Sequence, residues 1–288
     1  MSTTKSPRRV LVEAHAVASE ALPAYGHRKS PRRFTRPQLF ACLVLKAALG
    51  LDYRGPTALL ADASDLREAI GLRWVPHYTT FQKAAHRPLT GGSAQALLDA
   101  TAARAVRRGK LEVRPELVAV DSSGFESEHV SRYFARRRQK ASPDGRSRKV
   151  VYRRHPKLGL AVDCASHLVL AAVTSQGPRP DFGLFRPLID QAVRRIKPRA
   201  VLADAGFDSE AGHLYCRETL GIRSPIPARH GRPSCREPTT RYRRAMARHL
   251  KRSRYGQRWQ VETVFSMIKR NQGERSSTPA PTGEGAGS

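Results

Sequence analysis

Two short apolar runs that each end in an aspartate constrain the fold of this chain more than any other feature. Residues 117–120 are followed by Asp121, and residues 200–203 are followed by Asp204. A run of four apolar residues that ends at turn-forming residues is typical of a buried strand. A carboxylate at the end of such a strand is costly to desolvate unless it is paired or bound to a metal. We therefore expect a functional reason for both aspartates.

The surrounding pattern predicts the sheet to which these strands belong. Further strands are expected over 158–162, 168–173 and 222–226, and helices over 182–196 and 209–220, with a hairpin turn at 163–167. Three antiparallel strands followed by alternating helices and strands describe an α/β fold, a mixed five-stranded sheet with helices on both faces. In this ribonuclease H-like arrangement the first and fourth strands are neighbours, so Asp121 and Asp204 lie at adjacent strand ends.

A third carboxylate is predicted on a helix near the C-terminus. Over 255–269, helical spacing places Tyr255, Arg258, Glu262 and Lys269 on one side of the helix. The apolar residues of the same segment fall on a different stripe, which can face a core: Val261, Val264, Phe265 and Ile268. A solvated charged face is the alternative reading of this segment taken alone.

Asp121, Asp204 and Glu262 together indicate a metal site. Three carboxylates brought close together repel one another unless cations lie between them, and hard divalent cations prefer carboxylate oxygens. Two Mg²⁺ ions, with Mn²⁺ as a substitute, would clamp the attacking and leaving oxygens of an in-line phosphoryl displacement. We expect all three residues to be both metal ligands and catalytic residues.

The composition indicates a polyanionic partner. The chain carries 52 Lys and Arg residues against 24 Asp and Glu residues, a formal net charge of +28. An excess of this size favours binding of phosphate by long-range attraction and counterion release. Nucleic acid is therefore the favoured partner over a ribosomal or membrane-surface role.

The N-terminal third is predicted to be helical. Short helices with tight turns over 35–110 are typical of a helix-turn-helix-like DNA-binding module, with a purely structural bundle as the alternative. If the module binds DNA, the expected groove contacts are Thr79, Thr80, Gln82 and Lys83. The expected domains are a basic segment over 1–34, the helical domain over 35–110, a catalytic domain over 115–275 and a tail over 276–288.

Two other features are candidate DNA contacts. An arginine-rich loop over 132–154 includes Arg136, Arg137 and Arg138, which we expect to follow a DNA backbone; a solvated loop is the alternative. Trp259 could stack on an extruded base, and core packing is the competing interpretation. The sequence has no apolar run of about 18 residues and no signal-peptide pattern, so we expect a cytoplasmic, nucleoid-associated protein without a membrane partner.

The spacing Tyr255-x2-Arg258-x3-Glu262-x6-Lys269 resembles the DDE transposases of bacterial insertion sequences, in the group that carries this signature. The segments 118–125 and 202–209 are similar to the two aspartate motifs of that family. The resemblance implies that Asp121, Asp204 and Glu262 bind the metals and that Tyr255, Arg258 and Lys269 position DNA-end phosphates. It also implies double-stranded DNA as the partner, a homodimer on DNA, cleavage at terminal inverted repeats and strand transfer to a target.

The C-terminal region departs from the family pattern. Residues 276–288 are rich in Ser, Thr, Pro and Gly and are expected to be disordered. The resemblance implies a further apolar helical segment here, so we expect a truncated copy with an exposed apolar strip on the sheet or on the Val261/Val264/Phe265/Ile268 stripe. Two alternatives stay open: a decayed transposase that only binds DNA, and a ribonuclease H-like nuclease or resolvase.

Overall fold

The computed structural model describes residues 6–86, 92–127, 155–177, 180–228, 237–250, 254–272 and 275–276. These residues belong to two compact units, Met1–Glu112 and Val113–Ser288, and each unit is described by itself. The arginine-rich loop with Arg136, Arg137 and Arg138 lies outside the described residues, and so does the expected tail from residue 277 onward.

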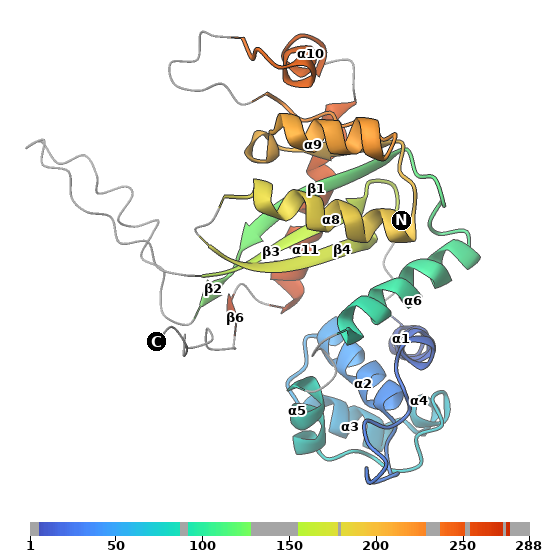
Figure 1. Cartoon of the computed structure of the whole chain (residues 1–288). Helices are drawn as coiled ribbons and strands as arrows, with labels where there is room; N and C mark the ends of the chain where they lie inside the picture. Colours follow the sequence, from blue (N-terminus) through green and yellow to red (C-terminus); the bar gives the residue numbers. More distant parts are fainter. Residues whose placement is uncertain are drawn as a thin grey trace, which may run out of the picture. The chain divides into compact units, whose positions relative to one another are not determined.

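The N-terminal unit is helical (Figure 1). Its helices are α1 (Pro7–Ala21), α2 (Arg36–Leu49), α3 (Arg54–Asp62), α4 (Ser64–Glu68), α5 (Tyr78–His86) and α6 (Ser93–Arg107). α2 begins after Thr35, whose hydroxyl accepts a hydrogen bond from the backbone N–H of Gln38. The Gln38 side chain accepts one from the backbone N–H of Thr35, which completes a capping box.

The core of this unit joins α1, α2, α3 and α5. Leu11, Leu45, Leu60 and Phe81 come from these four helices and are fully buried together. Each helix therefore buries an apolar stripe against its neighbours, which stabilises helices too short to persist alone.

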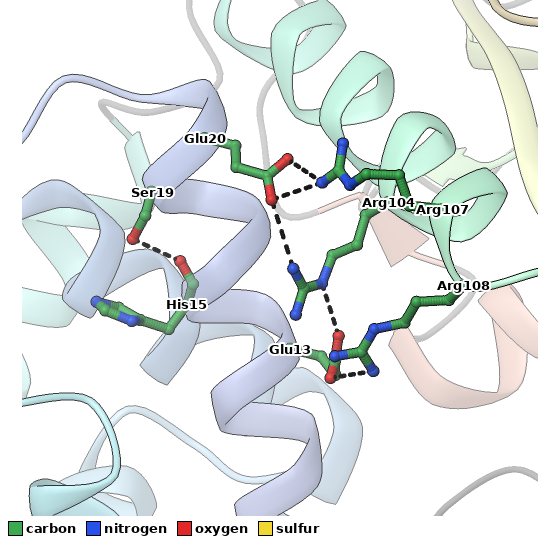
Figure 2. A network of polar contacts seen from close by, with 7 residues as sticks. All are labelled: Glu13, His15, Ser19, Glu20, Arg104, Arg107 and Arg108. Carbon is green, nitrogen blue, oxygen red and sulfur yellow. Dashed lines mark hydrogen bonds and ion pairs between the residues drawn. The ribbon is translucent and has the colours of Figure 1, made fainter.

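Charged side chains join α1 to α6 (Figure 2). Arg104 donates to Glu13 at 2.8 Å and contacts Glu20 at 3.4 Å. Arg107 pairs with Glu20 and Arg108 pairs with Glu13, each at 2.7 Å. The hydrogen bond from Arg104 lowers the pKa of Glu13, and the bond from Arg107 lowers that of Glu20. These three arginines are therefore engaged inside the unit.

The C-terminal unit is built on a four-stranded mixed sheet in the order β4-β3-β1-β5. The strands are β1 (Leu117–Gly124), β3 (His155–Asp163), β4 (Val169–Gly177) and β5 (Ala200–Ala203). β3 lies antiparallel to both β1 and β4, whereas β5 lies parallel to β1. The predicted hairpin turn is confirmed: Asp163 accepts hydrogen bonds from the backbone N–H and hydroxyl of Ser166.

The fifth predicted strand, over 222–226, is not formed. Only one parallel bridge joins Arg223 to Ala200, through backbone bonds from Val201 N to Arg223 O and from Arg223 N to Arg199 O. Pro225 and Pro227 follow, and neither has a backbone N–H to extend the ladder. The sheet therefore has four strands among the described residues.

Helices cover both faces of the sheet (Figure 1). α8 (Phe182–Arg195) packs on β3 and β4, and α11 (Trp259–Gln272) packs on β1 and β3. The segment after β5 contains η1 (Ala205–Phe207), α9 (Glu210–Leu214) and a π-helical turn, η2 (Tyr215–Thr219). The pair β2 (Glu126–Ser127) and β6 (Arg275–Ser276) is parallel. No described helix is long and apolar enough to span a membrane.

The apolar stripe of α11 is buried, so the expectation of an exposed strip on this face is wrong. Val261, Val264 and Phe265 are at most 5% exposed. They pack against the sheet residues on one face, namely Leu117, Ala119, Leu160, Val162, Ala200 and Leu202. The predicted helical periodicity is correct, and the apolar face of α11 packs directly against the sheet.

Candidate active site at the carboxyl ends of the central strands

Strand alternation places both aspartates on the α11 side of the sheet. Leu117 and Ala119 of β1 and Leu202 of β5 face α11, and side chains two residues further along point the same way. Continuing that alternation brings Asp121 and Asp204 to this face. The parallel register pairs Val120 with Ala203, so the two aspartates follow paired residues of adjacent strands. The predicted adjacency of the two strand ends is confirmed.

Asp121 is a mostly buried carboxyl. Its Oδ1 accepts a hydrogen bond from the backbone N–H of Ser122 at 2.8 Å, and its side chain is 19% exposed. Burial raises the pKa of Asp121 to about 6, and the negative charges of Asp204 and Glu262 add to the rise. The three predicted carboxylates therefore act on one another electrostatically.

Arg258 lies between two of these carboxylates. Its guanidinium is 3.5 Å from Asp121 Oδ2 and forms an ion pair with Glu262 one helical turn away. The positive charge lowers the pKa of Asp121, although burial outweighs it. A planar guanidinium can serve two acceptors at once, whereas an ammonium is a single point charge. Arg258 thus neutralises part of the negative charge that the fold concentrates here.

Tyr255 joins the same group from a tighter turn. The structure places Tyr255–Arg258 in a 3-10 helix, η4, and starts α11 at Trp259, so the single helix predicted over 255–269 is wrong at its beginning. Arg254 precedes it in the left-handed region at φ 57°, which breaks the helical path. Burial raises the pKa of Tyr255; the nearby charge of Arg258 lowers it and that of Asp204 raises it. The phenol is therefore close to both.

A pocket of about 610 Å³ opens beside this group along α11. Asp121 and Glu262 line it together with the side chains of Lys269 and Arg270, one to two turns further on. The ammonium of Lys269 lies 5.6 Å from the ring centroid of Phe125, within cation–π range. Ser122, Ser123 and Ser266 also line the pocket. The pocket thus joins carboxylates to cations, which suits a phosphate held beside metal ions.

Asp181, at the N-terminus of α8, also reaches the site and was not predicted. It accepts a hydrogen bond from the hydroxyl of Ser122 and forms an ion pair with Lys157, whose side chain is only 13% exposed. A Cβ built on Gly206 would lie 2.9 Å from an Asp204 oxygen and 3.5 Å from an Asp181 oxygen. Asp181 therefore contacts the segment after each aspartate. Its position 59 residues from Ser122 leaves no local signal in the sequence.

The other predicted DNA contacts belong to the N-terminal unit, to the start of α11 or to residues outside the described ones. Thr79, Thr80, Gln82 and Lys83 lie on α5 of the N-terminal unit, where Gln82 and Lys83 are exposed and the two threonines half-buried. Trp259 is 52% exposed at the start of α11, so it is not packed in the core.

The carboxylates suit a divalent ion by donor type. They supply hard oxygen ligands, and burial, with a smaller contribution from the charges of Asp204 and Glu262, raises the pKa of Asp121. Within the described parts of the chain, no three acidic, histidine or cysteine side chains are gathered closely enough to hold one metal ion. The guanidinium of Arg258 supplies the positive charge between Asp121 and Glu262 instead.

Comparisons with known proteins give a family. The family described as the transposase DDE domain matches residues 112–282. Two similar solved structures are a pre-cleavage Mos1 transpososome (11% identity, 87% of this chain, 80% of that chain) and the Mos1 mariner paired end complex with Mn (12%, 94% and 97%). Both have a TM-score of 0.24, too low for an argument about the fold. No curated protein matches the sequence.

Proposed function

Since this chain belongs to the transposase DDE domain family, we propose that it binds the terminal inverted repeats of an insertion sequence and cleaves DNA there. The freed 3′ ends are then joined to target DNA in the same site. The single observation that carries this proposal is the position of Asp121 and Asp204 at the adjacent carboxyl ends of β1 and β5, with Glu262 joined to Asp121 through Arg258. A sheet of this order, with α8 and α11 on its two faces, supports a ribonuclease H-like catalytic domain.

In this proposal, Asp121, Asp204 and Glu262 would hold two divalent ions, Mg²⁺ or Mn²⁺. Ions held there would supply activation of the attacking oxygen and stabilisation of the leaving oxyanion in an in-line phosphoryl transfer. The backbone N–H groups of Ser122 and Gly206 orient one oxygen each of Asp121 and Asp204, at 2.8 Å in both cases. The second oxygen of Asp121, Oδ2, lies 3.5 Å from the guanidinium of Arg258, so a ligand bound there would share it with that cation.

The cations and the phenol position the DNA. Arg258 bridges Asp121 and Glu262 in the protein alone, and with DNA bound its guanidinium is placed to contact the phosphate at the element end. Lys269 and Arg270 line the pocket that continues from this point and bind the neighbouring phosphates. The hydroxyl of Tyr255 donates a hydrogen bond to the same DNA strand, and the half-exposed ring of Trp259 stacks on a base.

The N-terminal unit supplies recognition of the repeat. Helices α2, α3 and α5 pack around one core, which supports a helix-turn-helix-like reader with α5 in the groove. Thr79, Thr80, Gln82 and Lys83 are its proposed base and backbone contacts. Joining two ends requires two active sites, so a homodimer on DNA, within the bacterial cytoplasm, is part of the proposal.

The experiment is an end-cleavage assay on a duplex that carries the terminal repeats. Metal-dependent nicking at the repeat end by the full chain, lost in Glu262→Gln, is the expected result. Glu116→Gln is the matched control, because Glu116 is a paired surface carboxylate of the same unit that does not line the pocket. Binding without nicking by the unaltered chain would indicate a remnant that only recognises DNA, and preference for branched or hybrid duplexes would indicate a resolvase or ribonuclease.

A further inference from the structure

A basic loop of the N-terminal unit, residues 24–36, is closed on itself. The backbone N–H of Arg36 donates to Ala24 O at 2.8 Å, and the hydroxyl of Tyr25 donates to Arg32 O at 3.4 Å. Inside the loop, the N–H of His27 donates to the hydroxyl of Ser30, and that of Ser30 to His27 O. These hydrogen bonds give the loop a defined conformation in the unbound protein.

The loop presents a row of exposed cations: Arg28, Lys29, Arg32 and Arg33. None of the four forms an ion pair with a described acidic residue, in contrast to Arg104, Arg107 and Arg108, which are all paired with Glu13 or Glu20 (Figure 2). The cations of the N-terminal unit thus include a paired set between α1 and α6 and an unpaired set on the loop. The charges of the loop set are therefore available to an outside partner.

An exposed aromatic ring lies against this loop. The guanidinium carbon of Arg33 is 5.5 Å from the ring centroids of both Phe34 and Trp74. Trp74 is 50% exposed, although a ring of that size is normally buried in a unit that has a core. Arg33 is therefore held in one orientation by two rings, so less entropy is lost when it binds a ligand.

The segment that carries Trp74 leads directly into α5. The side-chain amide of Gln38 donates to Ile70 O and Gly71 O, which fixes the start of this segment on α2. At its other end, Arg54 lies 5.0 Å from the ring of Tyr78, the first residue of α5. Cations and aromatic rings therefore extend from the loop to the beginning of the helix proposed to enter the groove.

We propose that Arg28, Lys29, Arg32, Arg33 and Trp74 form a clamp on the sugar–phosphate backbone of duplex DNA beside α5. In this basic clamp the four cations neutralise backbone phosphates, and the Trp74 ring packs against a deoxyribose. The clamp positions α5 and carries little sequence information of its own, as is usual for backbone contacts. This inference rests on the proposed function only in taking duplex DNA as the partner.

The test is the salt dependence of duplex binding by the full chain, measured by fluorescence anisotropy. Each neutralised phosphate contributes about 0.9 to the slope of log affinity against log salt. Arg28→Gln/Lys29→Gln/Arg32→Gln should therefore reduce the slope by about 2.7, so the loss of affinity should be about 500-fold larger at 0.1 M than at 1 M salt. The matched control, Arg8→Gln/Arg9→Gln/Lys110→Gln, removes the same charge from exposed positions of the same unit and should leave most of the slope intact.

A second readout follows Trp74 directly. The chain has two tryptophans, so Trp259→Phe leaves Trp74 as the only reporter. Duplex DNA should quench its fluorescence, and the quench should follow the binding curve. Equal slopes for the two triple variants, or an unchanged Trp74 signal at saturating DNA, would overturn the clamp while leaving metal-dependent cleavage untouched. Failure of the unaltered chain to bind any duplex would instead overturn the proposed function.

Discussion

The carboxylate of Asp181 accepts a hydrogen bond from the hydroxyl of Ser122, the residue that directly follows Asp121. Strand alternation sends Ser122 to the face of the sheet opposite Asp121, toward the N-terminus of α8. Asp181 therefore bonds to the end of β1 from the α8 side of the sheet, whereas Asp121 faces α11 on the other side. Asp181 also lies beside Gly206, two residues after Asp204, because a Cβ built there would be 3.5 Å from an Asp181 oxygen.

Asp181→Ala should lower the rate of end cleavage on the order of 10- to 100-fold, because small displacements of catalytic groups are costly. Duplex affinity should stay the same, and the Mn²⁺ concentration for half-maximal rate should rise. Asp190→Ala, on the same helix but bonded to Tyr215, is the control and should cleave normally. Equal rates for the two variants would show that Asp181 has no positioning role.

Asp121→Asn should stabilise the metal-free protein at pH 7.5. The pKa of Asp121 is raised from 3.8 to about 6, so its ionised form destabilises the folded state by about 3 kcal/mol above pH 6. That cost is absent below pH 3.8, where the carboxyl is protonated in both states. The gain from the variant should therefore shrink as the pH falls from 6 toward 4.

Urea unfolding with a chelator present, at pH 7.5 and pH 4.5, measures this difference. A variant that is less stable than the unaltered chain at pH 7.5, or a gain independent of pH, would contradict the assigned environment of Asp121. Divalent metal should stabilise the unaltered chain at pH 7.5 and should stabilise the variant less.

Arg258→Lys should lose most of the cleavage activity, at least about 10-fold, although it keeps the charge. The guanidinium reaches Asp121 and Glu262 together, and an ammonium cannot present that fork. Single-turnover cleavage of a repeat-end duplex is the measurement, with Arg194→Lys on the outer part of α8 as the control. A lysine variant as fast as the unaltered chain would mean that only the charge at this position matters.

Phe265→Ala should destabilise the C-terminal unit by about 3–5 kcal/mol, because the ring is 5% exposed in the core between α11 and the sheet. Met267→Ala is the matched control: it lies on the same helix, is 41% exposed and should cost under about 1 kcal/mol. Thermal unfolding followed by circular dichroism compares the two. Similar losses for both variants would contradict the packing of α11 on the sheet.

The spacing of apolar residues predicted the individual strands and the buried face of the C-terminal helix. The apolar runs before Asp121 and Asp204 are strands, and the Val261/Val264/Phe265 stripe is a buried helix face. The fifth strand was predicted from apolar residues, yet the prolines at 225 and 227 limit it to one bridge. The break before α11 depends on the left-handed backbone of Arg254, for which a non-glycine residue gives no signal.

Contacts between segments far apart in the chain could not be predicted from the sequence. The sequence patterns predicted no element over Arg241–His249, which form the helix α10. The carboxylate of Glu210, some 30 residues earlier, accepts the N–H groups of Tyr242 and Arg243 at its start, and Asp208 pairs with Arg243 at 2.8 Å. Asp181 was missed for the same reason, since only the folded sheet brings it to Ser122.

In the proposed mechanism, Asp121 and Asp204 are needed for DNA cleavage and do not contribute to duplex affinity. The most direct test measures duplex binding and metal-dependent nicking in the same samples of the unaltered chain and Asp121→Asn, on DNA that carries the terminal repeats. We expect equal duplex affinity for both proteins and nicking by the unaltered chain alone. Nicking by Asp121→Asn, at a rate near that of the unaltered chain, would contradict this mechanism.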